Sequence, residues 1–295
     1  MNRNLSWFLT GMAFAFLWPS AAAATKIGLQ FAQPLVIAEV RFWMASVIML
    51  FIAHVLNRER LPAGVEWKQL AWYGLLNISI YLGLYVVAMQ SVSAGIGTLA
   101  VATNPIFISL LSVLFLKKPL TASLVISIGI CLVGVLVAAW PLFRGVEVTA
   151  VGLVILFCGM LSYSGGSIYF SAQSWNGLSR LTINGWQTLL GGIFLLPVAL
   201  VFYKSTGNHF SSQFWFSVSW LAIPVSILAV QLWLRMLQIN PVRAGLWLFL
   251  CPVFGFLIAA WLLHEPINAY TLCGMVLVFA GLLLSRREIK RGASS

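Results

Sequence analysis

Ten long apolar stretches alternate with short polar connections along the chain. Each stretch is about twenty residues long, and at roughly 1.5 Å of rise per residue this length lets an α-helix cross a bilayer core of about 30 Å. The stretches are apolar at successive positions, whereas the strands of a membrane barrel would alternate. The pattern therefore predicts an all-α protein with ten transmembrane helices, at about Leu5–Ile27, Pro34–Val55, Gln69–Met89, Ile96–Leu116, Ala122–Leu142, Val151–Phe170, Leu181–Phe202, Phe214–Leu237, Ala244–Leu263 and Tyr270–Leu284.

The composition agrees with a protein that lies almost wholly within a membrane. Of its 295 residues, 61% are hydrophobic and 8% are charged, whereas a soluble domain carries about 25% charged residues. These values exclude a soluble enzyme, a nucleic-acid-binding module and a disordered chain. The longest polar connection, at about Asn57–Lys68, is too short for an extramembrane domain. We therefore expect the function to reside inside the helix bundle, with membrane lipid around it and no nucleic acid as partner.

The distribution of basic residues predicts how the helices are oriented. The net charge is +11, and lysine and arginine gather on the cytoplasmic side of membrane proteins. With the N terminus in the cytoplasm, 13 of the 17 basic residues fall on that side, while Lys26, Arg144 and Lys204 fall on the other and Arg41 lies within the second span. We predict a multi-pass protein of the plasma membrane (the inner membrane of a bacterium) with both termini cytoplasmic.

The first apolar stretch allows a second interpretation. Arg3, the apolar run up to Trp18 and the alanines at 21–24 resemble a cleaved signal peptide, and cleavage would leave nine spans. We favour an uncleaved first span, because the two halves of the chain can pair helix for helix only if it is kept.

The two halves of the chain are similar to each other. Residues 104–136 align without a gap when shifted by 147 positions, with eight identities in 33, among them Pro105 with Pro252. We predict two five-helix units, residues 1–145 and 146–295. Because five is an odd number, the units would lie in the membrane in opposite orientations. Inverted repeats of this kind build transporters, which hold the substrate near the bilayer midplane between the halves.

Several short motifs follow one another in order along the chain: Leu17-Trp18-Pro19-Ser20, Ala38-Glu39-Val40-Arg41-Phe42, Asn104-Pro105-Ile106-Phe107, Asn240-Pro241-Val242-Arg243-Ala244 and His264-Glu265-Pro266-Ile267. By the order and spacing of these motifs, the chain resembles the EamA-type transporters of the drug/metabolite transporter superfamily. The resemblance implies a ten-helix, inverted-repeat carrier, usually an exporter of amino acids, related metabolites or toxic compounds. The family commonly has a glutamate after the fourth and ninth spans. Glu265 fits the second position, but Lys118 stands at the first, which argues against a role that needs both acids.

Arg41 is the sharpest candidate for a substrate-binding residue. It lies about seven residues into the second span, roughly 10 Å deep, where a charge is costly unless protein or water surrounds it. It would either clamp a substrate carboxylate or bond backbone carbonyls at helix ends, and the sequence does not separate the two. Glu39 points about 200° away around the same helix. It is either an acid for proton coupling or, as we favour, a partner for Lys26 near the membrane surface.

Asn77, Tyr81 and Tyr85 share one face of the third span, since they are spaced at i, i+4 and i+8. We predict that this face forms a polar and aromatic cavity wall. The alternative is that these side chains join helices, with the tyrosines near a membrane interface.

Further candidates for the substrate-binding cavity are isolated polar or aromatic residues within the spans. Trp18 precedes a proline, which removes a backbone hydrogen bond and permits a kink. Tyr163 lies among small and hydroxyl residues that let helices approach closely. A buried amide needs a partner, which substrate, water or a core hydrogen bond can supply. The remaining candidates are Asn104, Gln187, Gln231 and Trp247.

These patterns predict a secondary transporter that moves small organic solutes, amino acids or related metabolites, by alternating access, with efflux implied by the resemblance. The sequence has no nucleotide-binding loop, no aspartate and no cysteine or histidine spacing typical of a metal site, so we expect no cofactor. Proton or ion coupling, and a monomer or a homodimer, both stay open. The alternative function is a non-transporting membrane sensor or assembly protein. An intramembrane enzyme is less favoured, because it would need convergent nucleophiles, histidines or acids.

Overall fold

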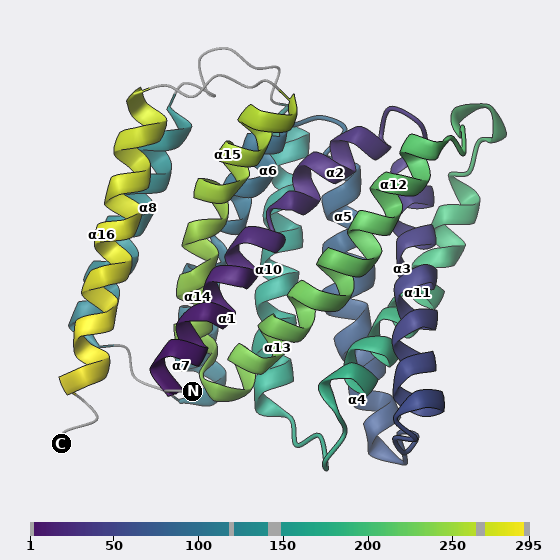
Figure 1. Ribbon diagram of the computed structural model, residues 1–295, viewed down its shortest axis with the longest axis horizontal. Helices are drawn as coiled ribbons and strands as arrows, with labels where there is room; N and C mark the ends of the chain where they lie inside the picture. Colours follow the sequence, from purple (N-terminus) through teal and green to yellow (C-terminus); the bar gives the residue numbers. More distant parts are fainter. Residues whose placement is uncertain (1–2, 118–120, 141–148, 264–268, 292–295) are drawn as a thin grey trace.

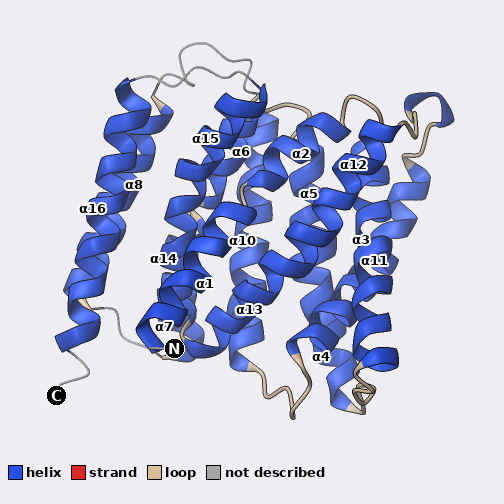
Figure 2. Cartoon of the chain, viewed as in Figure 1, coloured by secondary structure: helices blue, strands red, loops and turns tan. Residues whose placement is uncertain are grey.

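The computed structural model describes residues 3–117, 121–140, 149–263 and 269–291. All long elements in these ranges are helices, packed side by side in one bundle (Figures 1 and 2). The helices are α1 (Arg3–Leu17), α2 (Ser20–Gly28), α3 (Pro34–Leu50), η1 (Phe51–Leu56), α4 (Val65–Gly74), η2 (Leu75–Ile80), α5 (Tyr81–Ala88), α6 (Ala94–Val101), α7 (Asn104–Leu116), α8 (Ala122–Ala139), α10 (Ala150–Ala172), α11 (Arg180–Val201), η3 (Ser205–Gly207), α12 (Ser212–Trp220), η4 (Leu221–Ala229), α13 (Val230–Ile239), α14 (Pro241–Leu246), η5 (Trp247–Phe249), α15 (Leu250–Leu263) and α16 (Ala269–Arg291).

Eight helical segments are long and apolar enough to cross a membrane, and they coincide with the predicted first to fourth and sixth to ninth spans. The predicted fifth and tenth spans are the helices α8 and α16, whose apolar parts within the described residues are shorter, at Ala122–Gly134 and Leu272–Gly281. The prediction of an all-helical, multi-pass membrane protein is confirmed. That all ten helices cross the membrane stays a prediction.

The first span is broken where the sequence predicts a kink. Pro19 has no amide hydrogen to continue the helix, so α1 ends at Leu17 and α2 begins at Ser20. The Ser20 hydroxyl donates to the carbonyl oxygen of Leu17 at 2.6 Å and satisfies one acceptor that the break frees. Trp18, at the break itself, is buried inside the bundle.

π-helical turns interrupt the third and eighth spans at matching positions, because an offset of 147 residues carries η2 into η4. In both turns a neighbouring helix bonds a carbonyl oxygen. Ser162 Oγ donates to Leu76 O at 2.7 Å, and Asn184 Nδ2 donates to Ser226 O at 2.8 Å. Turns of this kind are frequent at functional sites. Tyr81, which directly follows η2, and Val225 of η4 line the same small pocket.

The helices α8 and α16 form a pair at one edge of the bundle (Figure 1). A Cβ added to Gly134 of α8 would lie 2.8 Å from the carbonyl oxygen of Gly274, and one added to Gly281 of α16 would lie 2.9 Å from that of Ser127. The two backbones therefore touch, and the order of the contacts along the chain shows that the helices are antiparallel. An offset of 147 residues converts each contact into the other.

The close approach at Gly134 predicts that one added methyl group weakens the α8–α16 pair. In Gly134→Ala the new Cβ would press on backbone atoms that cannot rotate away, so we expect a lower Tm, from overpacking that costs about 1–3 kcal/mol. Gly129→Ala on the same helix is the matched control, because no atom lies within 4 Å of its added Cβ. Thermal unfolding of the purified variants in detergent measures both. Equal Tm values would contradict this packing.

Candidate functional site

A small enclosed pocket lies in the middle of the bundle, where helices of the first half meet η4 of the second. Side chains fill most of it, and its open volume of about 10 Å³ is room for roughly one water molecule. Its polar and aromatic lining comes from Trp18, Arg41, Tyr81, Tyr85 and Thr98. Val225 is the lining residue from the second half of the chain.

Among the described residues that line the pocket, Arg41 is the one with a charged side chain. Its side chain is 1% exposed; Nε donates to Ser226 Oγ at 2.7 Å, and Nη1 has no hydrogen-bond partner. Within the described ranges the single ion pair joins Arg60 to Glu66, elsewhere in the molecule. A guanidinium buried without a counter-charge, with a donor unused, is costly in a medium of low dielectric constant.

Aromatic rings extend from the pocket into the bundle as one continuous cluster. Trp18 stacks with Phe14 and Tyr81 at centroid distances of 5.6 and 6.5 Å, and Tyr163 lies 4.7 Å from Tyr81 and 5.7 Å from Trp233. The hydroxyl of Tyr163 and Nε1 of Trp233 are buried without a hydrogen-bond partner. Buried polar groups without a partner are rare in native proteins. The cluster therefore has both free hydrogen-bonding groups and ring faces with which to bind a ligand.

A chain of buried amides connects the third span to the second half. Asn77 Nδ2 donates to Gln187 Oε1 at 3.3 Å, and Gln187 Nε2 donates to Asn184 Oδ1 at 2.9 Å. Asn184 in turn bonds the backbone of Ser226, whose hydroxyl accepts from Arg41. The amides mostly satisfy one another, which indicates that they order the helices around the pocket.

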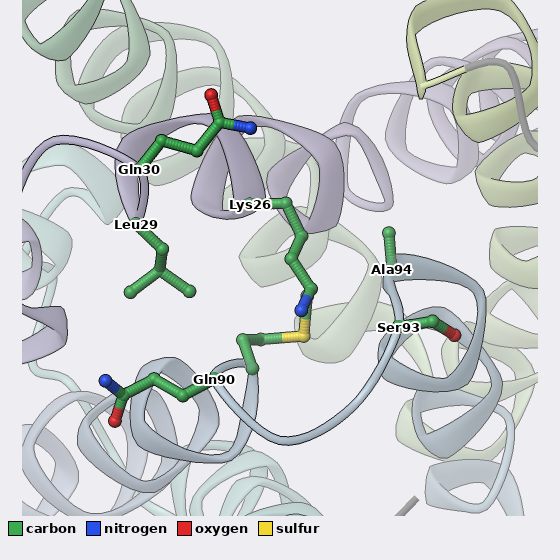
Figure 3. Close-up of a pocket in the computed structure, with 7 residues that line it drawn as sticks. Lys26, Leu29, Gln30, Gln90, Ser93 and Ala94 are labelled. Carbon is green, nitrogen blue, oxygen red and sulfur yellow. The ribbon is translucent and has the colours of Figure 1, made fainter. Parts of the chain in front are cut away.

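A second, larger cavity opens at the end of the bundle opposite the N terminus, and we call it the vestibule (Figure 3). Its volume of about 550 Å³ is in the range of ligand sites, roughly 300–1,000 Å³. Lys26 and Gln30, at the end of the first span, lie across the open space from Gln90 and Ser93, and the Lys26 side chain extends into it (Figure 3). The spans that line the vestibule also line the central pocket, one to two turns deeper.

Two side chains separate the vestibule from the central pocket. Met89 lines the vestibule and Tyr85 lines the pocket. Both pack on α6 at Gly97, where an added Cβ would lie 2.5 Å from Met89 Sδ and 3.2 Å from the Tyr85 hydroxyl. Met89 is fully buried. In this conformation the side chains of Met89 and Tyr85, packed on Gly97, therefore lie between the vestibule and the central pocket.

Polar contacts between the halves close the other end of the bundle, and we call them the latch. Glu59, in the connection after η1, accepts hydrogen bonds from the hydroxyls of Ser179 and Thr182. Arg60 donates to the carbonyl oxygen of Asn176 at 2.8 Å. Burial raises the pKa of Glu59, but the hydrogen bonds from Ser179 and Thr182 outweigh it and hold that pKa below its usual value. Glu59 therefore stays ionised at neutral pH, and the latch would be lost only as the pH falls through this lowered pKa.

Four of the ten predicted site residues, Trp18, Arg41, Tyr81 and Tyr85, meet in the central pocket. Tyr163 contacts Trp18 and Tyr81 through its ring. Asn77 and Gln187 do not line the pocket but reach Arg41 through the amide chain.

The other three predicted residues lie apart from the pocket. Asn104 accepts a hydrogen bond from Ser164 at 3.0 Å, which joins two helices. Gln231 Nε2 donates to the carbonyl oxygen of Arg180 at 3.1 Å, at the start of α11. Trp247 packs against α1. In this conformation each has a structural contact of its own.

The sequence interpretation missed two polar residues of the site, Thr98 and Ser226. A lone threonine in an apolar run gives no signal. Ser226 could have been found through the internal repeat, because the residue 147 positions earlier, Ser79, is also a serine.

Glu39 faces away from the pocket, toward α11. Its Oε2 accepts a hydrogen bond from Trp43 Nε1 at 3.0 Å and lies 3.6 Å from where a Cβ on Gly192 would be, while Oε1 is buried without a hydrogen-bond partner. The two family-motif positions Lys118 and Glu265 lie outside the described residues.

Known proteins resemble this chain over nearly its whole length. The EamA-like transporter family matches residues 5–140 and 150–287. Protein PecM of Dickeya dadantii (strain 3937) is 28% identical, over 92% of this chain and 90% of PecM. An uncharacterized transporter of Archaeoglobus fulgidus is 26% identical (96% and 99% covered), and the uncharacterized inner membrane transporter YedA of Escherichia coli (strain K12) is 27% identical (94% and 90%). A solved crystal structure shares the fold with a TM-score of 0.78 at 17% identity, over 95% of this chain and 97% of that one.

Proposed function

Because the chain belongs to the EamA-like transporter family, we propose that it is a secondary transporter that exports small organic solutes, amino acids or related metabolites, by alternating access. It would lie in the plasma membrane, the inner membrane of a bacterium, with ten spanning helices and both termini in the cytoplasm. The central pocket around Arg41 would be the substrate site, with the vestibule as the outer approach to it and the latch at the cytoplasmic end.

The pairing of α8 with α16 supports an inverted repeat, residues 1–145 and 146–295. Besides the reciprocal glycine contacts, Cys131 Sγ lies 3.6 Å from the carbonyl oxygen of Val278, and these two residues are themselves 147 positions apart. A contact between equivalent residues of two antiparallel helices is what a local two-fold axis produces. Such an axis would relate the halves in opposite orientations, as in transporters that alternate between two faces.

The unequal ends of the bundle are the observation that carries the proposal. The vestibule is open at one end, while the latch joins the halves at the other. Between the vestibule and the central pocket, the side chains of Met89 and Tyr85 pack against Gly97. One exposed approach, one end joined by the latch and a barrier of side chains between site and approach are what we expect for one state of an alternating-access cycle.

Flux measurements in proteoliposomes test the proposal. Vesicles that contain the purified protein would be loaded with radiolabelled amino acids and related metabolites, and we expect saturable, protein-dependent efflux of at least one of them without ATP. An imposed pH gradient that changes the rate would add proton coupling, and no change would leave facilitated diffusion or exchange. Solutes that quench tryptophan fluorescence but never move would contradict transport and favour a sensor.

A further inference from the structure

We infer that the preferred substrate carries a single net negative charge, as an organic monocarboxylate does, and that a zwitterionic amino acid is a poorer substrate. The inference rests on the proposed function and narrows its substrate class. It follows from the charge, the unused donor and the lining of the central pocket.

The pocket carries one positive charge that no lining residue neutralises. Arg41 is fully buried, its bond to Ser226 is to a neutral hydroxyl, and Nη1 has no hydrogen-bond partner. A carboxylate would supply the missing charge together with two oxygens, which a guanidinium can bind side by side. A ligand with a net charge of −1 therefore leaves the occupied pocket neutral.

A zwitterion would not leave the pocket neutral. Its ammonium group would find no carboxylate among the lining residues that the structure describes. Glu39, the acid nearest to Arg41 in the sequence, is bonded by Trp43 and lies against α11. The ring faces of Trp18 and Tyr81 attract a cation weakly, but Arg41 in the same pocket repels it.

The pocket has room for about one water molecule, so its side chains must move apart to admit a substrate. The aromatic ones among them favour a flat, apolar body on this anion. Trp18, Tyr81 and Tyr85 present aromatic rings to the pocket, and rings of a ligand can stack on them or meet them edge to face.

A matched pair of probes tests the charge preference: 3-phenyllactate, an anion, and phenylalanine, in which an ammonium group replaces the hydroxyl. In proteoliposomes with the full-length protein we expect 3-phenyllactate to half-saturate uptake at a concentration about tenfold or more below that of phenylalanine. Arg41→Gln should weaken 3-phenyllactate about tenfold to a hundredfold, which is the loss of a charge-assisted hydrogen bond, and so remove the preference. Arg41→Lys keeps the positive charge but loses the two parallel donors of the guanidinium, so it should retain part of the preference for 3-phenyllactate.

Thermal unfolding shows whether Arg41→Gln is folded, and so separates a loss of binding from a loss of structure. Without ligand, we expect Arg41→Gln to melt no lower than the parent protein, because the substitution removes an uncompensated buried charge. Millimolar 3-phenyllactate should raise the Tm of the parent but not of Arg41→Gln. A structural role for Arg41 would give the opposite pattern, a lower Tm and an unchanged probe preference.

Two results would overturn the inference while leaving transport intact: phenylalanine carried as well as 3-phenyllactate, or a preference for 3-phenyllactate that survives in Arg41→Gln. Absence of both flux and thermal stabilisation with 3-phenyllactate would also overturn it. The transport function is decided separately, by the efflux of the broader set of metabolites.

Discussion

Replacing Gly191 with leucine is expected to prevent the bundle from assembling. Gly191 lies in α11 where this helix crosses the third span, and an added Cβ would collide with Cβ of Ile78 and lie 2.8 Å from the carbonyl oxygen of Gly74. The reciprocal position is as crowded, since a Cβ on Gly74 would lie 2.5 Å from the carbonyl oxygen of Gln187. The Ser79 hydroxyl also donates to Gly191 O at 2.5 Å across the same crossing.

The expected loss is large because the leucine meets Cβ of Ile78 and the backbone of Gly74, neither of which can move without the helix, rather than the flexible end of a side chain. Overpacking a core costs about 1–3 kcal/mol and sometimes more, and here a whole helix of the second half would have to move away from the first. Against a net stability of about 5–15 kcal/mol, we expect little monodisperse protein after extraction from membranes in detergent. What remains should have a strongly lowered Tm.

Gly165→Leu is the matched control for Gly191→Leu. Gly165 also lies within a spanning helix, α10, but no atom lies within 4 Å of its added Cβ. Size-exclusion chromatography and thermal unfolding of the two variants, made side by side, measure the difference. Equal yields and equal melting would show that α11 does not approach the third span as closely as described.

The span pattern could be predicted from the sequence because each helix must satisfy its own backbone in lipid and must therefore be long and continuously apolar. The break at Pro19 was also predictable, since proline lacks the amide hydrogen. The π-helical turn η2 was not. It contains no proline, and Ser162 of α10 adds a hydrogen bond to the Leu76 carbonyl oxygen, which also accepts from the Tyr81 amide. The bond from Ser162 exists only after the two helices pack.

The candidate site was predictable where helical spacing alone decides which residues share a face. Tyr81 and Tyr85 lie one turn apart, and both line the pocket together with Arg41. Gln231 is also a polar residue inside a predicted span, yet its side chain donates to the backbone of Arg180 and does not line the pocket. Which face of a helix turns toward the pocket depends on how that helix crosses its neighbours, and one sequence does not contain this information.

Replacing Met89 with alanine is expected to connect the vestibule with the central pocket. Met89 is fully buried, lines the vestibule, and packs on Gly97 beside the Tyr85 hydroxyl. Alanine removes the part of the barrier that faces the vestibule, while Tyr85 can still swing between rotamers. The polar lining of the pocket should then become reachable by water and by small reagents from that end.

A cysteine at Thr98 reports the opening, because Thr98 lines the central pocket and is 1% exposed. In a background with the natural cysteines replaced by alanine, a charged thiol reagent should label Thr98→Cys slowly, through transient openings. If the open state is normally populated at about 0.1–10%, adding Met89→Ala raises the labelling rate by about tenfold to a thousandfold.

Met49→Ala is the control for Met89→Ala, since it removes the same side chain from another fully buried site that lines neither cavity. It should lower the stability about as much as Met89→Ala does, since both replace a buried methionine with alanine, but it should not change the labelling of Thr98→Cys. If both variants raise labelling equally, general loosening and not a local barrier controls access. If neither does, Met89 does not separate the vestibule from the pocket, and substrate would have to reach Arg41 by another route.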